Sequence, residues 1–398
     1  MDDRKYISEL SKCVRCGSCK AFCPVYDEDS MESMGARGRL SILLGLSTGK
    51  LVPSKILNDR IFSCTLCGAC SDLCPLGVDI KEVIYHGRNI LKKSDRQRRL
   101  LRFLTKLFTK RPKLCFKLLG MTQHMFLSYL SKKGLLPFQA ELPDRRFRDN
   151  VQVVTVPNKK GRVAVFTGCS IDFIYPQLGE SLINVLHALG YEVVLPAGEV
   201  CCGAPLRTLG LEEEAASMAN KNLDLFGKLH VDAVISLCPT CTLTIKKEYP
   251  KLVGKGIENA LDISEFIIDK LKAFPFSDLS AHIKTAFYHD PCHLKYGLGI
   301  TKEPRQIIRN AGIGLMDAEE SRCCGFAGLF CFSNKELSKG LLNKCIKGLE
   351  NPDAETIITS CPGCMMQLSR ESRNKPVLHL IEVIEDAMVH FYTALYFR

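Results

Sequence analysis

The chain has 398 residues, of which 46% are hydrophobic and 24% are charged, the composition of an ordinary soluble globular protein. Its length is enough for two to four domains, each with its own core. Neither a secretory signal nor an uninterrupted apolar run of about 18 residues is visible, so we expect a cytoplasmic protein without a membrane span. The formal net charge of +11 is concentrated in residues 91–150, which hold 16 lysines and arginines against four acidic residues.

Cysteine is the unusual residue in this composition, because the chain has 21 of them. In a protein that is not exported, many cysteines indicate metal or redox chemistry rather than a disulfide framework. The spacing of the cysteines along the chain therefore carries most of the functional information.

Residues 1–91 contain the same cysteine run twice. Residues 13–24 read CVRCGSCKAFCP and residues 64–75 read CTLCGACSDLCP. Each has the spacing C-x2-C-x2-C-x3-C-P, in which three cysteines hold one cubane [4Fe–4S] cluster and the fourth binds the other cluster. Gly17 and Gly68 let the backbone turn close to the cluster and direct N–H groups at its sulfides. The predicted ligands are Cys13, Cys16, Cys19 and Cys74 for one cluster, and Cys64, Cys67, Cys70 and Cys23 for the second.

Zinc is the alternative metal for these runs, but zinc sites usually take two separated C-x2-C pairs. The 40 residues between Cys23 and Cys64 are too many for a compact bacterial ferredoxin. Residues 36–46 predict a helix with an apolar stripe, and the arrangement resembles the helical ferredoxin domain of the succinate dehydrogenase iron–sulfur subunit and of the heterodisulfide reductase C subunit. Arg37 and Arg39 are either hydrogen-bond donors near a cluster or solvated helix charges.

Residues 92–158 predict a basic helical linker, with one helix that ends at Pro112 and a second apolar stretch after it. The apolar face of the first helix is formed by Leu100, Leu101, Phe103, Leu104, Leu107 and Phe108. Basic residues surround this face, namely Arg99, Arg102, Lys106 and Lys110. The favoured interpretation is a linker helix packed against the ferredoxin-like domain. The alternative is a docking surface for an anionic membrane or an acidic partner. Cys115 is expected in the core, and no motif indicates nucleic-acid binding.

Residues 159–398 consist of one pattern that occurs twice, in two domains predicted at 159–280 and 281–398. Each copy has a strand that ends near a cysteine, a Cys-Cys-Gly sequence, and a second strand followed by C-P-x-C at the start of a helix. The corresponding cysteines lie 122 or 123 positions apart, which indicates a duplication. The five cysteines of the first copy are Cys169, Cys201, Cys202, Cys238 and Cys241. Those of the second copy are Cys292, Cys323, Cys324, Cys361 and Cys364.

Alternating strands and helices predict parallel sheets with helices on both faces, and the carboxyl ends of parallel strands meet at one edge. We therefore expect the five thiols of each copy to gather in one crevice above its sheet. A backbone that bends at the glycine of Cys-Cys-Gly directs two neighbouring sulfurs at different irons of one large cluster, whereas zinc would need only four thiolates. Cubane clusters, zinc and redox disulfides remain alternatives. His289 and His293 flank Cys292, and we expect them to be structural or to donate hydrogen bonds; Cys331 and Cys345 are assigned no role.

The two ferredoxin runs followed by two C-x~30-CCG-x~35-CxxC patterns resemble the CCG-domain iron–sulfur oxidoreductases, especially the heterodisulfide reductase D subunit (the ~ marks family spacing as approximate). The chain is also similar to the iron–sulfur subunits of glycolate oxidase, lactate-utilisation complexes and anaerobic glycerol-3-phosphate dehydrogenase. This resemblance implies that each set of five cysteines holds a noncubane [4Fe–4S] cluster. In the glycolate and glycerol-3-phosphate relatives one or both CxxC elements are incomplete, whereas both are whole here.

The resemblance implies an iron–sulfur electron-transfer subunit of a multi-subunit oxidoreductase of anaerobic metabolism, in which two cubane clusters exchange electrons with the clusters of the CCG domains. Because the chain has no flavin fingerprint, the expected partner is a flavoprotein dehydrogenase, a membrane cytochrome or a quinone, with contact to the inner face of the membrane as an option. One alternative is a catalytic protein that reduces a disulfide at the noncubane clusters on Cys201, Cys202, Cys323 and Cys324. Another is a zinc-binding scaffold without enzymatic activity.

Overall fold

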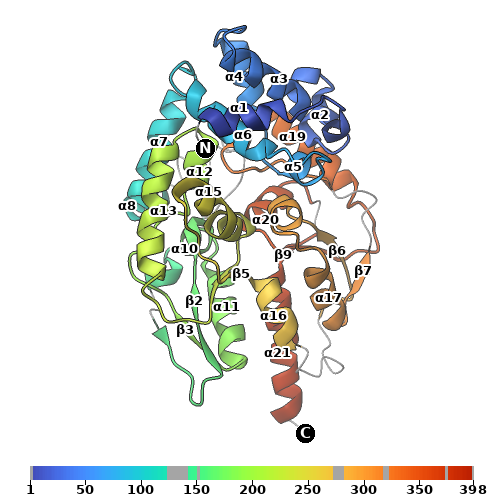
Figure 1. Cartoon of the computed structure of the whole chain (residues 1–398). Coiled ribbons are helices and arrows are strands. Elements are labelled where there is room, and N and C mark those ends of the chain that lie inside the picture. The colour runs from blue at the N-terminus through green and yellow to red at the C-terminus, as the bar shows by residue number, and fades with distance from the viewer. Residues whose placement is uncertain are drawn as a thin grey trace.

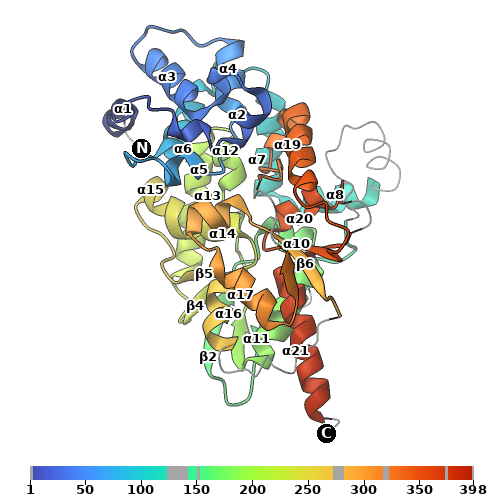
Figure 2. The ribbon, with the colours of Figure 1, turned by 90° about the vertical axis from the view of Figure 1, so that its right-hand side faces the viewer.

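The computed structural model describes residues 3–122, 142–149, 153–271, 282–316, 322–372 and 375–396. A helical N-terminal part lies at one end of the molecule, above two α/β halves that lie side by side (Figure 1). The side view shows the C-terminal helix projecting from the opposite end (Figure 2). This arrangement matches the fold predicted from the sequence: a helical ferredoxin-type part followed by two α/β repeats with parallel sheets.

The N-terminal part is built from short helices around its own apolar core. The helices are α1 (Asp3–Ser11), η1 (Ser18–Lys20), α2 (Pro24–Asp29), η2 (Glu32–Met34), α3 (Ala36–Ser47), α4 (Lys55–Phe62), α5 (Ala69–Asp72) and α6 (Ile80–Leu91). The predicted helix at 36–46 is therefore confirmed as α3, with Leu40 and Leu43 buried in this core. The first cysteine run lies between α1 and α2, around η1, and the second lies between α4 and α6, around α5.

The middle segment contains α7 (Arg99–Lys110) and α8 (Pro112–Thr122), and the break at Pro112 is where the sequence predicts it. Cys115 is buried, as expected for a core thiol. Helix α7 packs on the neighbouring domains with its polar side, however, because Arg102 is buried while Leu100 and Phe103 are exposed. The linker helix is thus packed against the ferredoxin-like part at Phe62 and against the first repeat at Leu209, and the sequence pattern did not indicate which face it would bury. Most of residues 123–158 lie outside the described residues, apart from η4 (Phe147–Asp149) and the first strand.

The first α/β half is a five-stranded sheet in the order β1-β3-β2-β4-β5, parallel except for the β1–β3 pair. Its strands are β1 (Val153–Val154), β2 (Gly161–Val165), β3 (Tyr191–Val194), β4 (Ala233–Ser236) and β5 (Ala260–Asp262). Its helices are α10 (Gly168–Phe173), α11 (Pro176–Ala188), α12 (Ala204–Thr208), α13 (Glu212–Phe226), α14 (Pro239–Leu243), the π-helix η5 (Thr244–Glu248), α15 (Tyr249–Val253) and α16 (Ile263–Leu271).

The second half is a four-stranded parallel sheet in the order β7-β6-β8-β9, the same order as β3-β2-β4-β5 of the first half. Its strands are β6 (Thr285–His289), β7 (Gly314–Met316), β8 (Thr356–Thr359) and β9 (Val377–His379). Its helices are the π-helix η7 (His293–Leu298), α17 (Lys302–Asn310), α18 (Phe330–Ser333), α19 (Lys335–Lys347), α20 (Pro362–Leu368) and α21 (Leu380–Tyr396). The duplication read from the cysteine spacing is therefore a duplication of the sheet itself.

The alternation of side chains along β2 explains how each half is built. Val163 and Val165 face a large core, whereas Ala164 and Phe166 face the layer that contains Cys202 and the C-P-x-C cysteines. The large core joins both halves, since it also includes Tyr288 and residues of α11 and α21. The two cysteine-bearing layers thus rest on a single shared core that holds them in a fixed relation.

Among the described helices, none combines the length and the apolar character that crossing a membrane requires.

Candidate metal centres

The first ferredoxin run and the last cysteine of the second run line one cavity. Cys13, Cys16, Cys19 and Cys74 all contribute to its wall, beside Leu40 and Val78. Gly17 has φ +90°, a left-handed conformation that L side chains rarely adopt, and this turns the loop around the cavity. Arg37 supports the loop from α3, because its Nη1 donates a hydrogen bond to the Arg15 carbonyl oxygen at 3.1 Å.

Arg37 is itself held by a carboxylate. Its Nε donates to Glu32 Oε1 at 2.6 Å, and this contact is the main reason why the pKa of Glu32 falls to about 2. Arg37 is therefore not a freely solvated charge: its side chain positions the loop between Cys13 and Cys16, and its backbone is in hydrogen-bonding contact with the Cys19 thiol. Of the two interpretations that the sequence left open, the geometry favours hydrogen bonding beside the cavity.

The second run and Cys23 line a second cavity, with Cys23, Cys64, Cys67 and Cys70 in its wall. Gly68 repeats the conformation of Gly17, with φ +87°. Two buried arginines hold the backbone that leads into this loop. Arg39 Nε donates to the Arg60 carbonyl oxygen at 2.8 Å, and Arg88 Nη2 donates to the Cys64 carbonyl oxygen at 2.6 Å. The structure thus brings together the same two sets of four cysteines that the spacing predicts.

The five cysteines of the first repeat form a continuous chain of contacts. Hydrogen-bonding contacts between the thiols join Cys169 to Cys201, Cys201 to Cys202, Cys202 to Cys241, and Cys241 to Cys238. Cys169 lies in the first turn of α10 rather than on the preceding strand, and Cys238 lies immediately before α14. Gly203 has φ +87°, which turns the backbone after the cysteine pair and lets its N–H donate to the Cys201 sulfur at 3.5 Å.

The second repeat reproduces these contacts at the equivalent positions. Thiol contacts join Cys292 to Cys323, Cys323 to Cys324, Cys324 to Cys364, and Cys364 to Cys361. The sulfurs of Cys324 and Cys364 are 3.4 Å apart, and the Gly325 N–H donates to the Cys323 sulfur at 3.4 Å. Both repeats therefore gather all five predicted thiols in one place, and all 21 cysteines of the chain are free thiols.

The chemistry of these four groups fits iron–sulfur clusters. Burial and the neighbouring Cys292 thiol raise the pKa of Cys67 to about 12, and burial raises the pKa of Cys70 well above its usual range. These two thiols resist ionisation because their thiolates would be desolvated and repelled by neighbouring sulfurs. In the two repeats, hydrogen bonds from neighbouring thiols lower the pKa of Cys202, to about 6, and of Cys324 and Cys361. A bound metal cluster supplies the positive charge that stabilises thiolates, as in all cysteine-ligated metal sites.

The second ferredoxin loop lies directly against the second repeat. His293, next to Cys292, donates from Nε2 to the Leu66 carbonyl oxygen at 3.1 Å and accepts at Nδ1 from the Thr240 hydroxyl at 2.8 Å. Burial and the nearby Lys81 lower the pKa of His293 to about 4, so the ring is neutral and one tautomer satisfies both contacts. Leu66 belongs to the second ferredoxin run and Thr240 to the C-P-x-C of the first repeat. His293 therefore connects three cysteine-bearing loops, which is a more specific role than the sequence suggested.

The two repeats also meet at their own cysteines. The Cys238 and Cys361 side chains, which begin the two C-P-x-C elements, are in hydrogen-bonding contact. Burial strongly lowers the pKa of His379, to about 4, and this histidine donates from Nε2 to the Leu237 carbonyl oxygen at 3.0 Å beside that contact. The four groups of cysteines thus form one series. It runs from the cavity of Cys13 to that of Cys67, then to the second repeat at Cys292, and then to the first repeat at Cys238.

The two repeats differ in the residues behind their cysteine pairs. In the second repeat, His289 and Cys324 lie within one candidate metal-binding group with Cys364, and His289 Nδ1 lies 3.6 Å from the Cys345 sulfur. The equivalent residues in the first repeat are Phe166 and Asn222, and the Asn222 amide donates to the Val200 and Cys201 carbonyl oxygens. Cys345, which the sequence left without a role, is therefore part of a polar pair that only the second repeat has.

A buried ionic network, which the sequence did not reveal, fastens the ferredoxin-like part to the first repeat. Arg207 of α12 lies 2.6 Å from Glu82 of α6 and 3.5 Å from Glu248, and Lys81 lies 2.7 Å from Glu248. Burial acts to raise the pKa of Glu248, but Lys81 and Arg207 outweigh it and hold that pKa at about 2. The only sequence signal was a set of charged residues within helices that are otherwise apolar, and such residues are ordinarily solvated.

Family models match three regions of the chain. A cysteine-rich domain, CCG, matches residues 163–246 and again 286–369, and a 4Fe-4S dicluster domain matches residues 9–78. Both matches fall on the regions that contain the four groups of cysteines.

Curated proteins resemble the chain over nearly its whole length. A probable glycolate oxidase iron–sulfur subunit of Bacillus subtilis is 28% identical over 96% of this chain and 95% of the relative. The B subunit of the CoM/CoB fumarate reductase of Methanothermobacter marburgensis is 27% identical over 97% of this chain and 74% of the relative. The D subunit of the dihydromethanophenazine:CoB–CoM heterodisulfide reductase of Methanosarcina barkeri is 25% identical over 96% of this chain and 95% of the relative.

A solved structure shares the fold. It is a hypothetical protein from Helicobacter pylori, with a TM-score of 0.55 and 13% identity over 97% of this chain and 73% of that protein. The domain matches and the full-length relatives together place the molecule: the chain belongs to the CCG-domain family of iron–sulfur oxidoreductase subunits, in which a 4Fe-4S dicluster domain precedes two cysteine-rich domains.

Proposed function

We propose that this chain is the electron-transfer subunit of a multi-subunit oxidoreductase. Cys13, Cys16, Cys19 and Cys74 hold one cubane [4Fe–4S] cluster, and Cys23, Cys64, Cys67 and Cys70 hold the second. The five cysteines of each repeat hold a noncubane [4Fe–4S] cluster. When bound, these clusters supply one-electron transfer, and the protein sets their positions, burial and hydrogen bonding.

One observation carries this proposal: the four groups of cysteines lie near one another in series, and Cys19 of the first group acts to raise the pKa of Cys70 in the second. Cys292 lies close enough to Cys67 to help raise the pKa of that thiol, and Cys238 contacts Cys361. His293 ties the second ferredoxin loop to both repeats. A redox partner such as a flavoprotein dehydrogenase, a membrane cytochrome or a quinone would exchange electrons at one end of this series.

The contact between Cys238 and Cys361 favours a second candidate function. In this function the protein reduces a disulfide substrate that binds between the two repeats. Cleaving a disulfide bond takes two electrons and two protons and yields two thiols. Two one-electron centres side by side suit this stoichiometry. The relative that is named as the D subunit of a heterodisulfide reductase is consistent with this candidate, as are the two complete C-P-x-C elements.

A reoxidation experiment separates the two candidates. The anaerobic holoprotein is reduced with dithionite, freed of excess reductant and mixed with a mixed disulfide of two small thiols, and the released thiol and the visible absorption are followed. An electron-transfer protein gives no more thiol than the variant Cys364→Ser. Release of two thiols for every two electrons stored in the reduced clusters, without a partner, would contradict a purely electron-transferring role. The variant Cys16→Ser is the matched control, because it removes a ligand at the far end of the series and leaves both repeats intact.

A further inference from the structure

Helix α7 turns its apolar face away from the protein. Leu100, Phe103, Leu104 and Leu107 follow the i, i+3, i+4, i+7 spacing of one helix face, and their exposed fractions lie between 40% and 69%. A helix at the surface of a globular protein normally buries such a face. The exposed apolar face of α7 is therefore best explained by a contact with something outside the folded chain.

The inner face of α7 is polar, and its groups are paired. Arg102 is buried, where its Nε donates to the Leu209 carbonyl oxygen at 3.0 Å and its Nη2 to Asp95 at 2.6 Å. The hydroxyls of Thr105 and Thr109 are satisfied by carbonyl oxygens of the helix itself, each at 2.8 Å. Rotating the helix to bury its leucines would remove Arg102 from these partners, so the outward direction of the apolar face is built into the fold.

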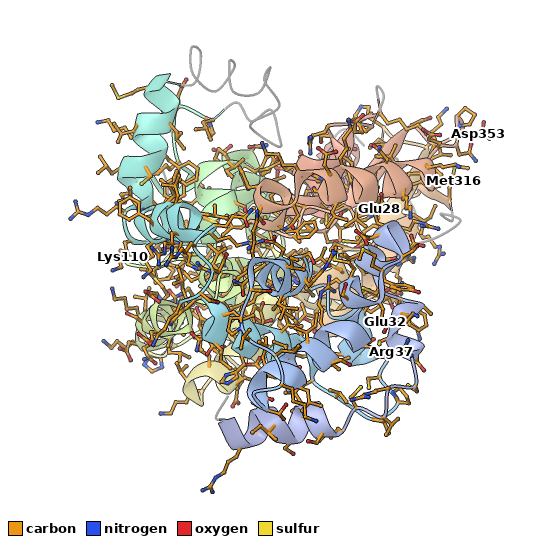
Figure 3. The ribbon with its side chains drawn as sticks, turned by 90° about the horizontal axis from the view of Figure 1, so that it is seen from above. Glu28, Glu32, Arg37, Lys110, Met316 and Asp353 are labelled. Carbon is orange, nitrogen blue, oxygen red and sulfur yellow. The ribbon has the colours of Figure 1, made fainter. Side chains whose placement is uncertain are left out.

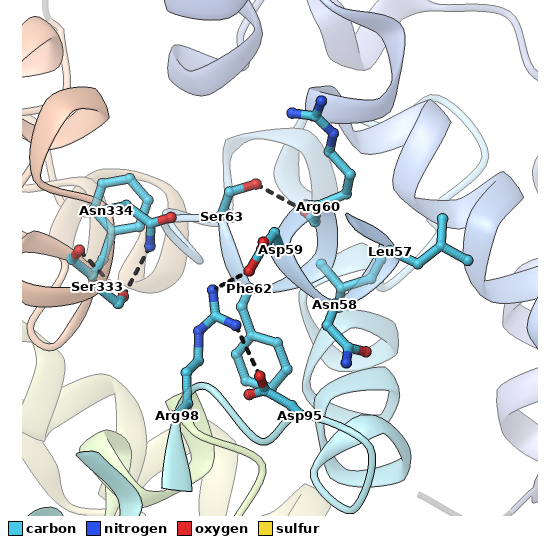
Figure 4. Close-up of polar contacts among 12 residues, drawn as sticks. Leu57, Asn58, Asp59, Arg60, Phe62, Ser63, Asp95, Arg98, Ser333 and Asn334 are labelled. Carbon is cyan, nitrogen blue, oxygen red and sulfur yellow. Dashed lines mark hydrogen bonds and ion pairs between the residues drawn. The ribbon is translucent and has the colours of Figure 1, made fainter. Parts of the chain in front are cut away.

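The N-terminal end of α7 is fixed to the ferredoxin-like part. Arg98, just before the helix, donates to Asp59 at 3.0 Å and to Asp95 at 3.2 Å, and its guanidinium lies 4.7 Å from the centre of the Phe62 ring (Figure 4). Phe62 is two residues before Cys64 of the second ferredoxin run. Anything that holds the outer face of α7 therefore also positions this run.

Helix α8, which directly follows α7, also exposes apolar side chains. The outer apolar surface, as we define it, consists of Leu100, Phe103, Leu104 and Leu107 of α7 with Leu114 and Met121 of α8, all exposed. Exposed basic residues accompany it, namely Arg96, Arg99, Lys110, Arg111, Lys113 and Lys117. Asp95 is the acidic residue of the segment 92–122, and it is buried against Arg98 and Arg102. The exposed charged residues of α7 and α8 are thus all positive. Figure 3 shows Lys110, at the end of α7, on the opposite side of the molecule from Arg37 of the ferredoxin-like part.

We propose that the outer apolar surface docks on an anionic lipid membrane. Interfacial helices lie in the membrane plane with leucine and phenylalanine among the acyl chains and with lysine and arginine at the lipid phosphates. A 12-residue helix with this face and these flanking cations meets both requirements. The inference goes beyond the proposed function and does not depend on it, since lipid binding needs no electron transfer.

The chain has no tryptophan, so Phe103→Trp places a single fluorescent reporter in the centre of this surface. The anaerobic holoprotein with this change is titrated with phosphatidylcholine vesicles and with vesicles of equal parts phosphatidylcholine and phosphatidylglycerol. We expect a blue shift and quenching by brominated lipid with the anionic vesicles, and affinity for neutral vesicles at least about tenfold weaker, because each cation near the surface contributes. High salt weakens the binding.

Two variants in this background decide whether the surface itself is responsible. Leu100→Ser with Leu107→Ser removes binding, whereas Val52→Ser with Ile56→Ser, which changes two apolar residues of the ferredoxin-like part that are on average even more exposed, keeps it. An unchanged visible spectrum confirms that the clusters remain. Absence of binding to both vesicle types, equal binding to both, or equal binding by both variants would overturn the proposal. So would a dimer that only the leucine variant disrupts, since the surface would then join two copies of this chain.

Discussion

His289 is a residue at which the two cysteine-rich repeats differ beside their cysteines. Its ring lies against Cys324 and Cys345, whereas the first repeat has Phe166 at the equivalent position. Burial acts to lower the pKa of His289, but the neighbouring sulfurs of Cys345 and Cys324 outweigh it and raise that pKa. Hydrogen bonds to the sulfur ligands of a cluster raise its reduction potential, so two repeats with identical ligands are expected to have different potentials.

The substitution His289→Phe copies the first repeat into the second. We expect the midpoint potential of one centre to fall and the other three to stay unchanged, since the hydrogen bond to sulfur is lost while all 18 cysteines that we propose as ligands remain. A redox titration followed by electron paramagnetic resonance measures this. The control is His230→Phe, an exposed histidine before β4. If His289→Phe shifts no potential, or shifts all four together, His289 does not tune the second repeat.

At Gly168 the backbone passes close to the Cys241 sulfur of the first repeat. Its φ is +61°, and an added Cβ would lie 2.8 Å from the Cys241 sulfur. Gly49 has a similar φ of +71°, but an added Cβ there would meet nothing within 4 Å. Comparing alanine substitutions at Gly168 and Gly49 therefore separates the effect of backbone strain from the effect of crowding the Cys241 sulfur.

We expect Gly168→Ala to lose about four irons per chain, the content of one [4Fe–4S] centre. Gly49→Ala keeps its iron and loses only about 1–2 kcal/mol from the strained backbone. Iron analysis of anaerobically purified protein gives the answer. Equal iron contents in the two variants would show that no cluster occupies the space beside Cys241.

At the scale of elements, α6 and α12 are joined by the Arg207 network, which connects the ferredoxin-like part to the first repeat. Arg207 is almost completely buried between Glu82, Glu212 and Glu248, and its guanidinium lies 4.0 Å from the centre of the Tyr85 ring. Removing one partner from a buried ionic network is costly because the remaining charges have neither water nor a counter-ion.

Arg207→Met is therefore expected to destabilise the folded chain by about 3–5 kcal/mol. Arg162→Met removes a half-exposed arginine that pairs with Glu192, and we expect a loss of at most about 1 kcal/mol. Calorimetry of the two anaerobic holoproteins measures this difference. We expect the first unfolding transition at a lower temperature for Arg207→Met than for Arg162→Met. Transitions at the same temperature would contradict a structural role for the network.

The elements also show what the sequence was able to predict. Cysteine spacing predicted which thiols come together, because a short loop leaves few places for its sulfurs, and the 122 or 123-residue offset predicted the second sheet from the first. The pattern of α7 predicted an amphipathic helix but not which face is buried, because that depends on the distant partners Leu209 and Asp59. The contacts of His293 were equally hidden, since Leu66 and Thr240 are far from it in the sequence.

At the scale of the whole molecule, the shared core of the two sheets explains how the cysteine groups keep their order. Residues of α11 and α21 belong to this one core, so the repeats cannot separate without exposing it. The Arg207 network attaches the ferredoxin-like part to the first repeat, and His293 attaches it to the second. Four groups of thiols are thereby held in one series from the surface at Cys16 to the interior at Cys238.

The account rests on the assignment of these four groups to iron–sulfur clusters. The most direct test is the iron and acid-labile sulfide content of the anaerobically purified chain, with zinc measured in the same sample. We predict about 16 irons and about 16 sulfides per chain, as four [4Fe–4S] centres require. Colourless protein that contains zinc and less than about half of that iron would contradict the account.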